Sequence, residues 1–110
     1  MKVTWDINKN FLKELTEEVL VPAVKKQNEV AIKNAIEYAP KKTGALAKSI
    51  EGKVEADKSE IKSVIGSEKD YAIYQELGTS KFSGKYFFRR GILSSIKTLE
   101  AEIKKNMESK

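Results

Sequence analysis

Hydrophobic and polar residues alternate at two places in the chain. Val3, Trp5 and Ile7 stand at every second position between polar residues, and this period of two predicts a short strand with one buried face. Residues 48–66 alternate in the same way on both sides of the turn-like sequence at 57–59. This second stretch therefore predicts a β-hairpin.

Two longer stretches carry apolar residues at intervals of three and four, which is typical of amphipathic helices. The first runs from Phe11 to Tyr38, and the second from about Phe88 to Met107. Asn8 or Asn10 is suited to cap the start of the first helix. Pro22 removes one backbone donor inside it, so we expect a kink or a short break there, and Pro40 ends it.

A shorter helix is predicted at residues 71–77, where Tyr71, Tyr74 and Leu77 are three residues apart and share one face. Gly78 fits the left-handed conformation that closes such a helix. Thr43 and Gly44 lie in a tight connection and are predicted to be structural turn residues, although an exposed loop that reaches a neighbouring molecule is an alternative for them.

These elements predict one α+β domain over residues 1–110. We expect a long kinked N-terminal helix and a C-terminal helix to pack on one face of a small antiparallel sheet.

Composition removes most catalytic chemistry. The 110 residues contain no cysteine and no histidine, which excludes thiolate metal sites and every Ser/His or Cys/His nucleophile arrangement. Ser-x-x-Lys occurs twice, beginning at Ser59 and Ser94, but a lysine-rich chain produces it by chance. We therefore predict that the protein is not an enzyme and needs no cofactor. No apolar run suits a signal peptide or a membrane span.

The net charge of +5 is local. Residues 79–97 contain Lys81, Lys85, Arg89, Arg90 and Lys97 and no acidic residue, whereas the remaining basic and acidic side chains cancel. Six of the nine aromatic residues lie in the overlapping stretch from Tyr71 to Phe88. The basic character is thus expected on one aromatic-rich surface.

Three ordered sequence clusters resemble the phage tail-component family related to a lambdoid minor tail protein. The first is a long helix ending in Ala39-Pro40, followed by Thr43-Gly44-Ala45-Leu46 and Ser49-Ile50; the second is Gly66 followed by residues 71–79. The third is Phe87-Phe88-Arg89 before a final helix. The resemblance spans roughly residues 30–96; Tyr86 and Arg90 differ from it, since prolines are frequent there.

The resemblance implies a structural virion protein of a tailed phage or prophage. It would complete the tail or join head to tail by forming a ring at the tail end or neck. It would be found in the host cytoplasm during assembly and in the virion afterwards. Its partners would be copies of itself and adjoining tail or neck proteins, with passing contact to genomic DNA and none to a membrane. Neither a cofactor nor a catalytic residue accompanies this family.

The aromatic and basic stretch is the candidate interface, because interface centres favour aromatic residues and arginine. The candidate residues are Tyr71, Tyr74, Glu76, Thr79, Lys81, Phe82, Lys85, Tyr86, Arg89 and Arg90. We expect Leu77 and Phe87 in the core, whereas partner contact and core packing are both open for Tyr74, Phe82 and Tyr86. Glu76 is a candidate to pair with Lys81, Arg89 or Arg90, within or between subunits.

A small basic nucleic-acid-binding module is the alternative. Basic residues interleaved with Phe82, Tyr86, Phe87 and Phe88 resemble a stacking groove with phosphate contacts. No helix-turn-helix, zinc-finger or RNA-recognition signature accompanies them.

Overall fold

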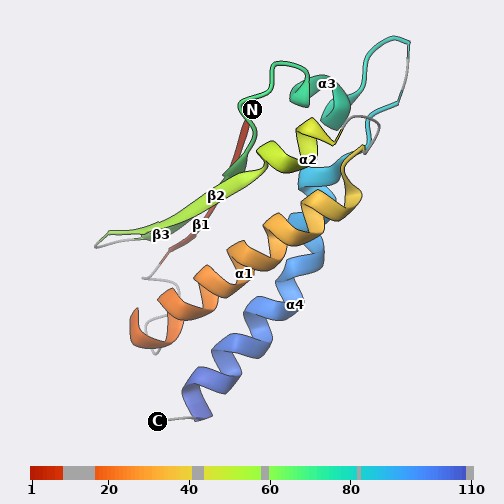
Figure 1. Cartoon of the computed structure of the whole chain (residues 1–110). Helices are drawn as coiled ribbons and strands as arrows, with labels where there is room; N and C mark the ends of the chain where they lie inside the picture. Colours follow the sequence, from red (N-terminus) through yellow and green to blue (C-terminus); the bar gives the residue numbers. More distant parts are fainter. Residues whose placement is uncertain (9–16, 41–43, 58–59, 82, 109–110) are drawn as a thin grey trace.

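The chain forms an α+β domain in which long helices lie over a small sheet (Figure 1). The computed structural model describes residues 1–8, 17–40, 44–57, 60–81 and 83–108. The elements are β1 (Lys2–Asn8), α1 (Glu17–Tyr38), α2 (Ala45–Ser49), β2 (Glu51–Ala56), β3 (Glu60–Gly66), α3 (Ala72–Leu77) and α4 (Phe87–Glu108). The predicted fold class is confirmed.

The sheet is antiparallel, with strand order β1-β3-β2. Ser63 in the central strand lies opposite Trp5 on one side and Val54 on the other. The predicted hairpin is confirmed, except that it begins at Glu51 because Lys48 and Ser49 belong to α2. At its turn, Asp57 N–H donates to the Glu60 carbonyl at 2.9 Å. Because side chains alternate along a strand, the buried residues Ile61, Ser63 and Ile65 share the face that meets the helices.

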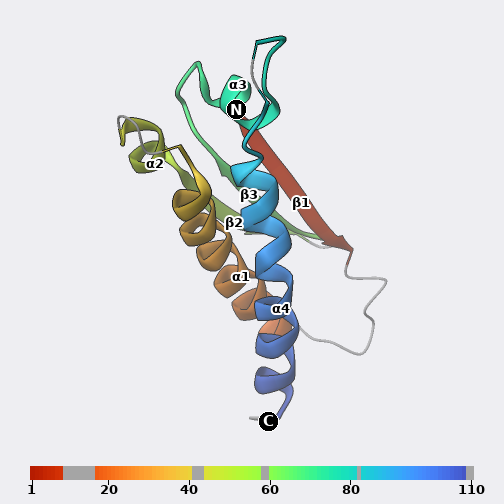
Figure 2. The same ribbon diagram turned by 90° about the vertical axis from the view of Figure 1, so that its right-hand side faces the viewer.

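α1 covers the sheet and α4 runs back alongside α1 in the opposite direction (Figures 1 and 2). α4 packs chiefly on α1, and its Leu99 and Ile103 pack against the cluster formed by Leu20 and Val24 of α1 and Ile61 of β3. The two helices approach closely at Gly91, where a Cβ atom would lie 2.7 Å from the Ala31 carbonyl oxygen and 2.8 Å from the Ala35 nitrogen. Glycine thus permits this crossing.

We expected a kink or a short break at Pro22. α1 is continuous through this exposed residue, so the helix is not broken there. The helix ends at Tyr38, before Pro40, as predicted. The predicted first turns at residues 11–16 and the cap at Asn10 lie outside the described residues.

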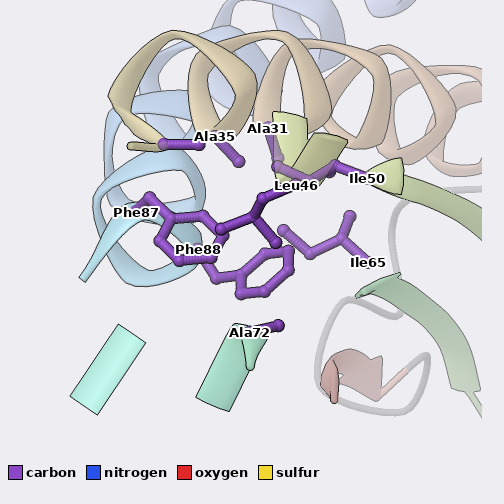
Figure 3. Close-up of a cluster of buried hydrophobic side chains, with 9 residues drawn as sticks. Ala31, Ala35, Leu46, Ile50, Ile65, Ala72, Phe87 and Phe88 are labelled. Atoms are coloured by element: carbon purple, nitrogen blue, oxygen red, sulfur yellow. The ribbon is translucent and has the colours of Figure 1, made fainter. Parts of the chain in front are cut away.

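The main core lies where both long helices meet the end of the sheet (Figure 3). Phe87 and Phe88 are fully buried, with ring centroids 4.4 Å apart, and they pack in one cluster with Ile65. Leu46, from α2, joins the same cluster. The sequence pattern did not predict α2, since a helix of five residues is too short to establish a period.

Buried amides tie α1 to the sheet. The Trp5 indole N–H donates to Gln27 Oε1 at 3.2 Å, and the Asn28 amide donates to the Val64 carbonyl oxygen at 3.2 Å. Both amide side chains therefore have a hydrogen-bond partner, as buried polar groups require.

Candidate functional site

α3 turns most of its apolar side chains outward. Tyr74 and Leu77 are each 56% exposed, Ile73 is 44% exposed and Tyr71, which precedes the helix, is 39% exposed. The residues of α3 that are buried are Ala72 and Glu76. The expectation that Leu77 packs in the core is therefore wrong, whereas the same expectation for Phe87 is confirmed.

Glu76 sets this orientation. Its carboxylate accepts hydrogen bonds from the backbone N–H groups of Phe88 at 2.8 Å and Arg89 at 3.1 Å. These amides lie in the first turn of α4, where N–H groups have no acceptor within the helix and negative charge is favoured. The side chain of Glu76 must point into the protein to reach them, so the opposite side of α3 faces solvent.

The loop after α3 folds back onto it. Lys85 N–H donates to the Gln75 carbonyl at 2.7 Å and Tyr86 N–H donates to the Glu76 carbonyl at 3.0 Å. Gly84 permits this approach, because a Cβ there would lie 2.3 Å from the Glu76 carbonyl oxygen. The C-terminal carbonyls of the short helix are thereby satisfied, and α3 is held against the start of α4.

Gly78 ends α3 as predicted, but its ψ of −179° gives it an extended conformation with positive φ and not the expected left-handed helical one. It has φ +85°, and its N–H donates to the Tyr74 carbonyl at 2.7 Å. Gly44 also has a positive φ, +74°, and directly precedes α2, which agrees with a structural turn role. Thr43 lies outside the described residues.

Tyr86 extends the exposed apolar surface from α3 to the start of α4. It is 40% exposed and has φ +51°, a conformation that a bulky residue adopts only when its surroundings hold it there. The Arg89 guanidinium lies 6.0 Å from the centroid of its ring. We call the exposed apolar set at this end of the molecule the tip, and its members are Tyr71, Ile73, Tyr74, Leu77 and Tyr86.

The predicted basic residues surround the tip in sequence and are exposed: Lys81, Lys85, Arg89 and Arg90. Thr79 is exposed too, and its Oγ1 accepts a hydrogen bond from Lys81 N–H at 3.1 Å. The Arg90 guanidinium lies 4.1 Å from the centroid of the Tyr38 ring, in cation–π geometry. Phe82 lies outside the described residues.

Three sequence-based expectations about these residues change. Glu76 is buried, and its hydrogen bonds to backbone amides occupy the carboxylate that we considered for pairing with basic side chains. Phe87 and Phe88 are buried and not available to stack on bases, which removes two members of the proposed nucleic-acid groove. Ile73 and Leu77 belong to the exposed surface but were not among the candidates.

Other kinds of site find little support in the part of the chain that is described. No group of three or more acidic side chains there is placed to hold a metal ion. None of the helices within the described ranges is long and apolar enough to cross a membrane.

Comparison with known proteins gives one match. The model of the family described as "Bacteriophage HK97-gp10, putative tail-component" matches residues 6–78, more than half of the 110 residues. This range includes the first of the three resembling clusters and nearly all of the second, and it ends at Gly78, so the third cluster lies beyond it. Searches of curated proteins and of solved structures found no match.

Proposed function

The chain belongs to the bacteriophage HK97-gp10-like family of tail components, and we propose that it completes the tail or joins head to tail by assembling as a ring at the tail end or neck. Membership makes it a phage structural protein, whose place is in the virion. The finer role, the ring and a passage through the host cytoplasm during assembly are our proposal.

The observation that carries the proposal is the tip. A single-chain domain rarely gathers large apolar side chains on one exposed short helix, and such patches mark contact sites. Tyr74 and Leu77, at 56% exposure each, are the most exposed members. The sequence left core packing and partner contact open for Tyr74 and Tyr86. We propose partner contact for both residues.

The tip is also fixed before any partner arrives. The carboxylate of Glu76 and the backbone hydrogen bonds of Lys85 and Tyr86 hold α3 in place. An ordered surface loses less conformational freedom on association, so a larger part of its contact energy appears as affinity. Around it, Lys81, Lys85 and Arg89 favour partners with acidic surfaces.

Deletion of the gene, followed by electron microscopy of phage lysates, tests the role. We expect heads and tails that fail to join, or tails with abnormal ends. Complementation with the wild-type gene should restore joined particles, whereas the double variant Tyr74→Ser/Leu77→Ser should not. The control is Ala101→Ser, an exposed change on α4 away from the tip. Normal particles without the gene would contradict an assembly role.

A passing contact with genomic DNA is a second proposal, supported by the exposed cations Lys81, Lys85, Arg89 and Arg90. Such binding would rest on phosphate contacts and would weaken steeply as salt rises. Titration of duplex DNA at increasing NaCl concentration tests it. Tight binding that survives physiological ionic strength would instead favour a dedicated nucleic-acid-binding module.

A further inference from the structure

β1 is an edge strand with a free side. In the part of the chain that the structure describes, β1 pairs with β3 alone, and the strand order is β1-β3-β2. α1 lies chiefly over β2 and β3, and Figure 2 shows β1 at the border of the sheet, on the side away from α1. Such an edge presents N–H and C=O groups that can pair with a strand of another chain.

The hydrogen bonds of β1 show which of its residues face the free side. The Met1 amino group donates to the Ser67 carbonyl at 2.8 Å, and Ser67 N–H donates to the Met1 carbonyl at 2.9 Å. In an antiparallel ladder, a pair that exchanges both bonds alternates with a pair whose backbone groups point away. The register therefore turns the N–H and C=O groups of Lys2, Thr4 and Asp6 to the free side. These three residues are exposed.

The sequence of this edge is complementary to itself. Residues 2–6 are Lys2-Val3-Thr4-Trp5-Asp6. When a second copy is laid antiparallel with Thr4 opposite Thr4, Lys2 of each copy lies opposite Asp6 of the other. On the other face of the sheet, Val3 of each copy then lies opposite Trp5 of the other. Opposite charges, two threonines, and an aromatic with a β-branched residue are all cross-strand pairs that stabilise a sheet.

Val3 and Trp5 also have apolar surface left to cover. Both pack against the main core but are only half-buried. The indole N–H of Trp5 already donates to Gln27 Oε1 at 3.2 Å, which holds the ring in place before any contact forms. A second β1 strand would cover the exposed parts of both side chains with little loss of side-chain freedom.

We infer that β1 pairs antiparallel with β1 of a second copy of this chain, so that the two sheets become one and Thr4 lies at the two-fold axis. The outward groups of the two strands would form about six backbone hydrogen bonds. The contact is isologous and stops at a dimer. It goes beyond the proposed ring, because it uses another surface than the tip and concerns the free chain.

The other edge of the sheet is less suited to pair with its own copy. Asp57 N–H donates to the Glu60 carbonyl, so alternation turns Val54 and its second neighbours outward. Pairing of two β2 strands about Val54 would place Glu51 of each copy opposite Asp57 of the other, and like charges there are destabilising. Gly52, at an outward position, has no side chain to pack.

Proline at an outward position tests the contact. Thr4→Pro removes an N–H that points away from β3, so the strand should still pair within the chain. Ala56→Pro is the matched control, because Ala56 is exposed and occupies an outward position on β2. Both changes are made in the Tyr74→Ser/Leu77→Ser chain, so that contacts through the tip do not contribute. Circular dichroism and thermal unfolding verify folding.

Sedimentation equilibrium and NMR up to millimolar concentration then measure association. We expect the Tyr74→Ser/Leu77→Ser chain and its Ala56→Pro form to dimerise equally. Thr4→Pro should weaken the dimer by about tenfold or more, since both copies lose a backbone donor. Hydrogen exchange at the amides of Lys2, Thr4 and Asp6 should slow as concentration rises.

Charge exchange provides a test that does not depend on proline. Lys2→Glu and Asp6→Lys each place like charges opposite one another in their own dimers, which should weaken by about threefold to fivefold. An equimolar mixture of the two variants restores two opposite-charge pairs and should form a heterodimer as tight as the unchanged dimer. These differences should shrink at high salt.

A single introduced thiol tests the register, because the chain has no cysteine. Directly opposite residues of a hydrogen-bonded pair have Cα atoms about 5.5 Å apart, within the range of a disulfide. Thr4→Cys should therefore form a disulfide dimer in a glutathione buffer. Lys2→Cys should not, since its thiols would lie on opposite sides of the axis.

Three results would overturn the inference. They are a Tyr74→Ser/Leu77→Ser chain that stays monomeric at millimolar concentration, a Thr4→Pro form that dimerises as well as the Ala56→Pro form, and equal disulfide formation by Thr4→Cys and Lys2→Cys. None of them bears on the lysate experiment, so the tail role and this contact can fail separately.

Discussion

Replacing Glu76 should destabilise the protein, because its buried carboxylate holds the start of α4. Its two carboxylate oxygens accept hydrogen bonds from the N–H groups of Phe88 and Arg89, and the residue is 3% exposed. In Glu76→Ala both amides lose their acceptor at the start of a helix of 22 residues. Hydrogen bonds to charged groups contribute about 1.5–3 kcal/mol each.

The two bonds share one carboxylate and are not independent, so we expect Glu76→Ala to lower the free energy of unfolding by about 3 kcal/mol, the lower end of the combined range. For a domain of this size that corresponds to a fall in melting temperature of roughly 12 °C or more. Glu76→Gln keeps one acceptor oxygen and loses the charge, and should cost about 2 kcal/mol.

Urea unfolding followed by circular dichroism measures both variants, and hydrogen exchange should become faster at the amides of Phe88 and Arg89. The matched control is Glu37→Gln, which changes an exposed carboxylate of α1 and should alter stability by less than about 0.5 kcal/mol. A loss below about 1 kcal/mol in Glu76→Ala would refute the reasoning, since it would mean that water replaces the carboxylate at little cost.

Three further predictions concern packing, the tip and the open face of the sheet. Gly91→Ala should destabilise by about 2 kcal/mol in urea unfolding, although alanine is the better helix former, because its methyl group would meet the α1 backbone; unchanged stability would contradict the close crossing. Tyr74→Ser should leave the melting temperature of the dilute protein within about 2 °C of wild type, since the side chain is 56% exposed; a large loss would mean that Tyr74 is part of the core. The pKa of Glu60 is raised, first by a hydrogen bond to Asp6 and then by desolvation and the Asp6 charge. Protonated Glu60 therefore stabilises the folded state at low pH. This stabilisation is lost as the pH rises through the raised pKa. In an NMR titration, Asp6→Ala should move the pKa of Glu60 back toward its ordinary value; an unmoved pKa would exclude Asp6 as the cause.

Sequence periodicity predicted the parts of the fold whose pattern is long or local. The first strand, the hairpin and both long helices follow from repeated intervals of two or of three and four residues, and Gly78 and Pro40 mark helix ends by their own backbone preferences. α2 could not be predicted in this way, because it owes its helix to the burial of Leu46 among Phe87, Phe88 and Ile65. Tertiary packing decides such short elements.

The orientation of α3 was the main error, and its cause is long-range. The spacing of Tyr71, Tyr74 and Leu77 favours an apolar buried face, whereas the structure buries Ala72 and Glu76. The carboxylate becomes an inward group only because the first turn of α4 lies beside it and offers the free amide of Phe88. Ala72 and Glu76 are four residues apart, a spacing that places them on the same face of α3. This spacing indicates a buried face only when the N-terminus of α4 is known to lie next to α3.

The anchoring of α3 to the first turn of α4 would couple folding to the proposed assembly. A partner that binds Tyr74 and Leu77 would also keep Glu76 in position. The Glu76 carboxylate in turn accepts hydrogen bonds from the Phe88 and Arg89 amides at the start of α4. Binding to the folded form alone raises its apparent stability by mass action. In the proposed ring, fraying of this helix end and dissociation of subunits would therefore be linked. A subunit within the tail would then resist heat better than the same subunit free in solution, and its melting temperature would rise with its own concentration.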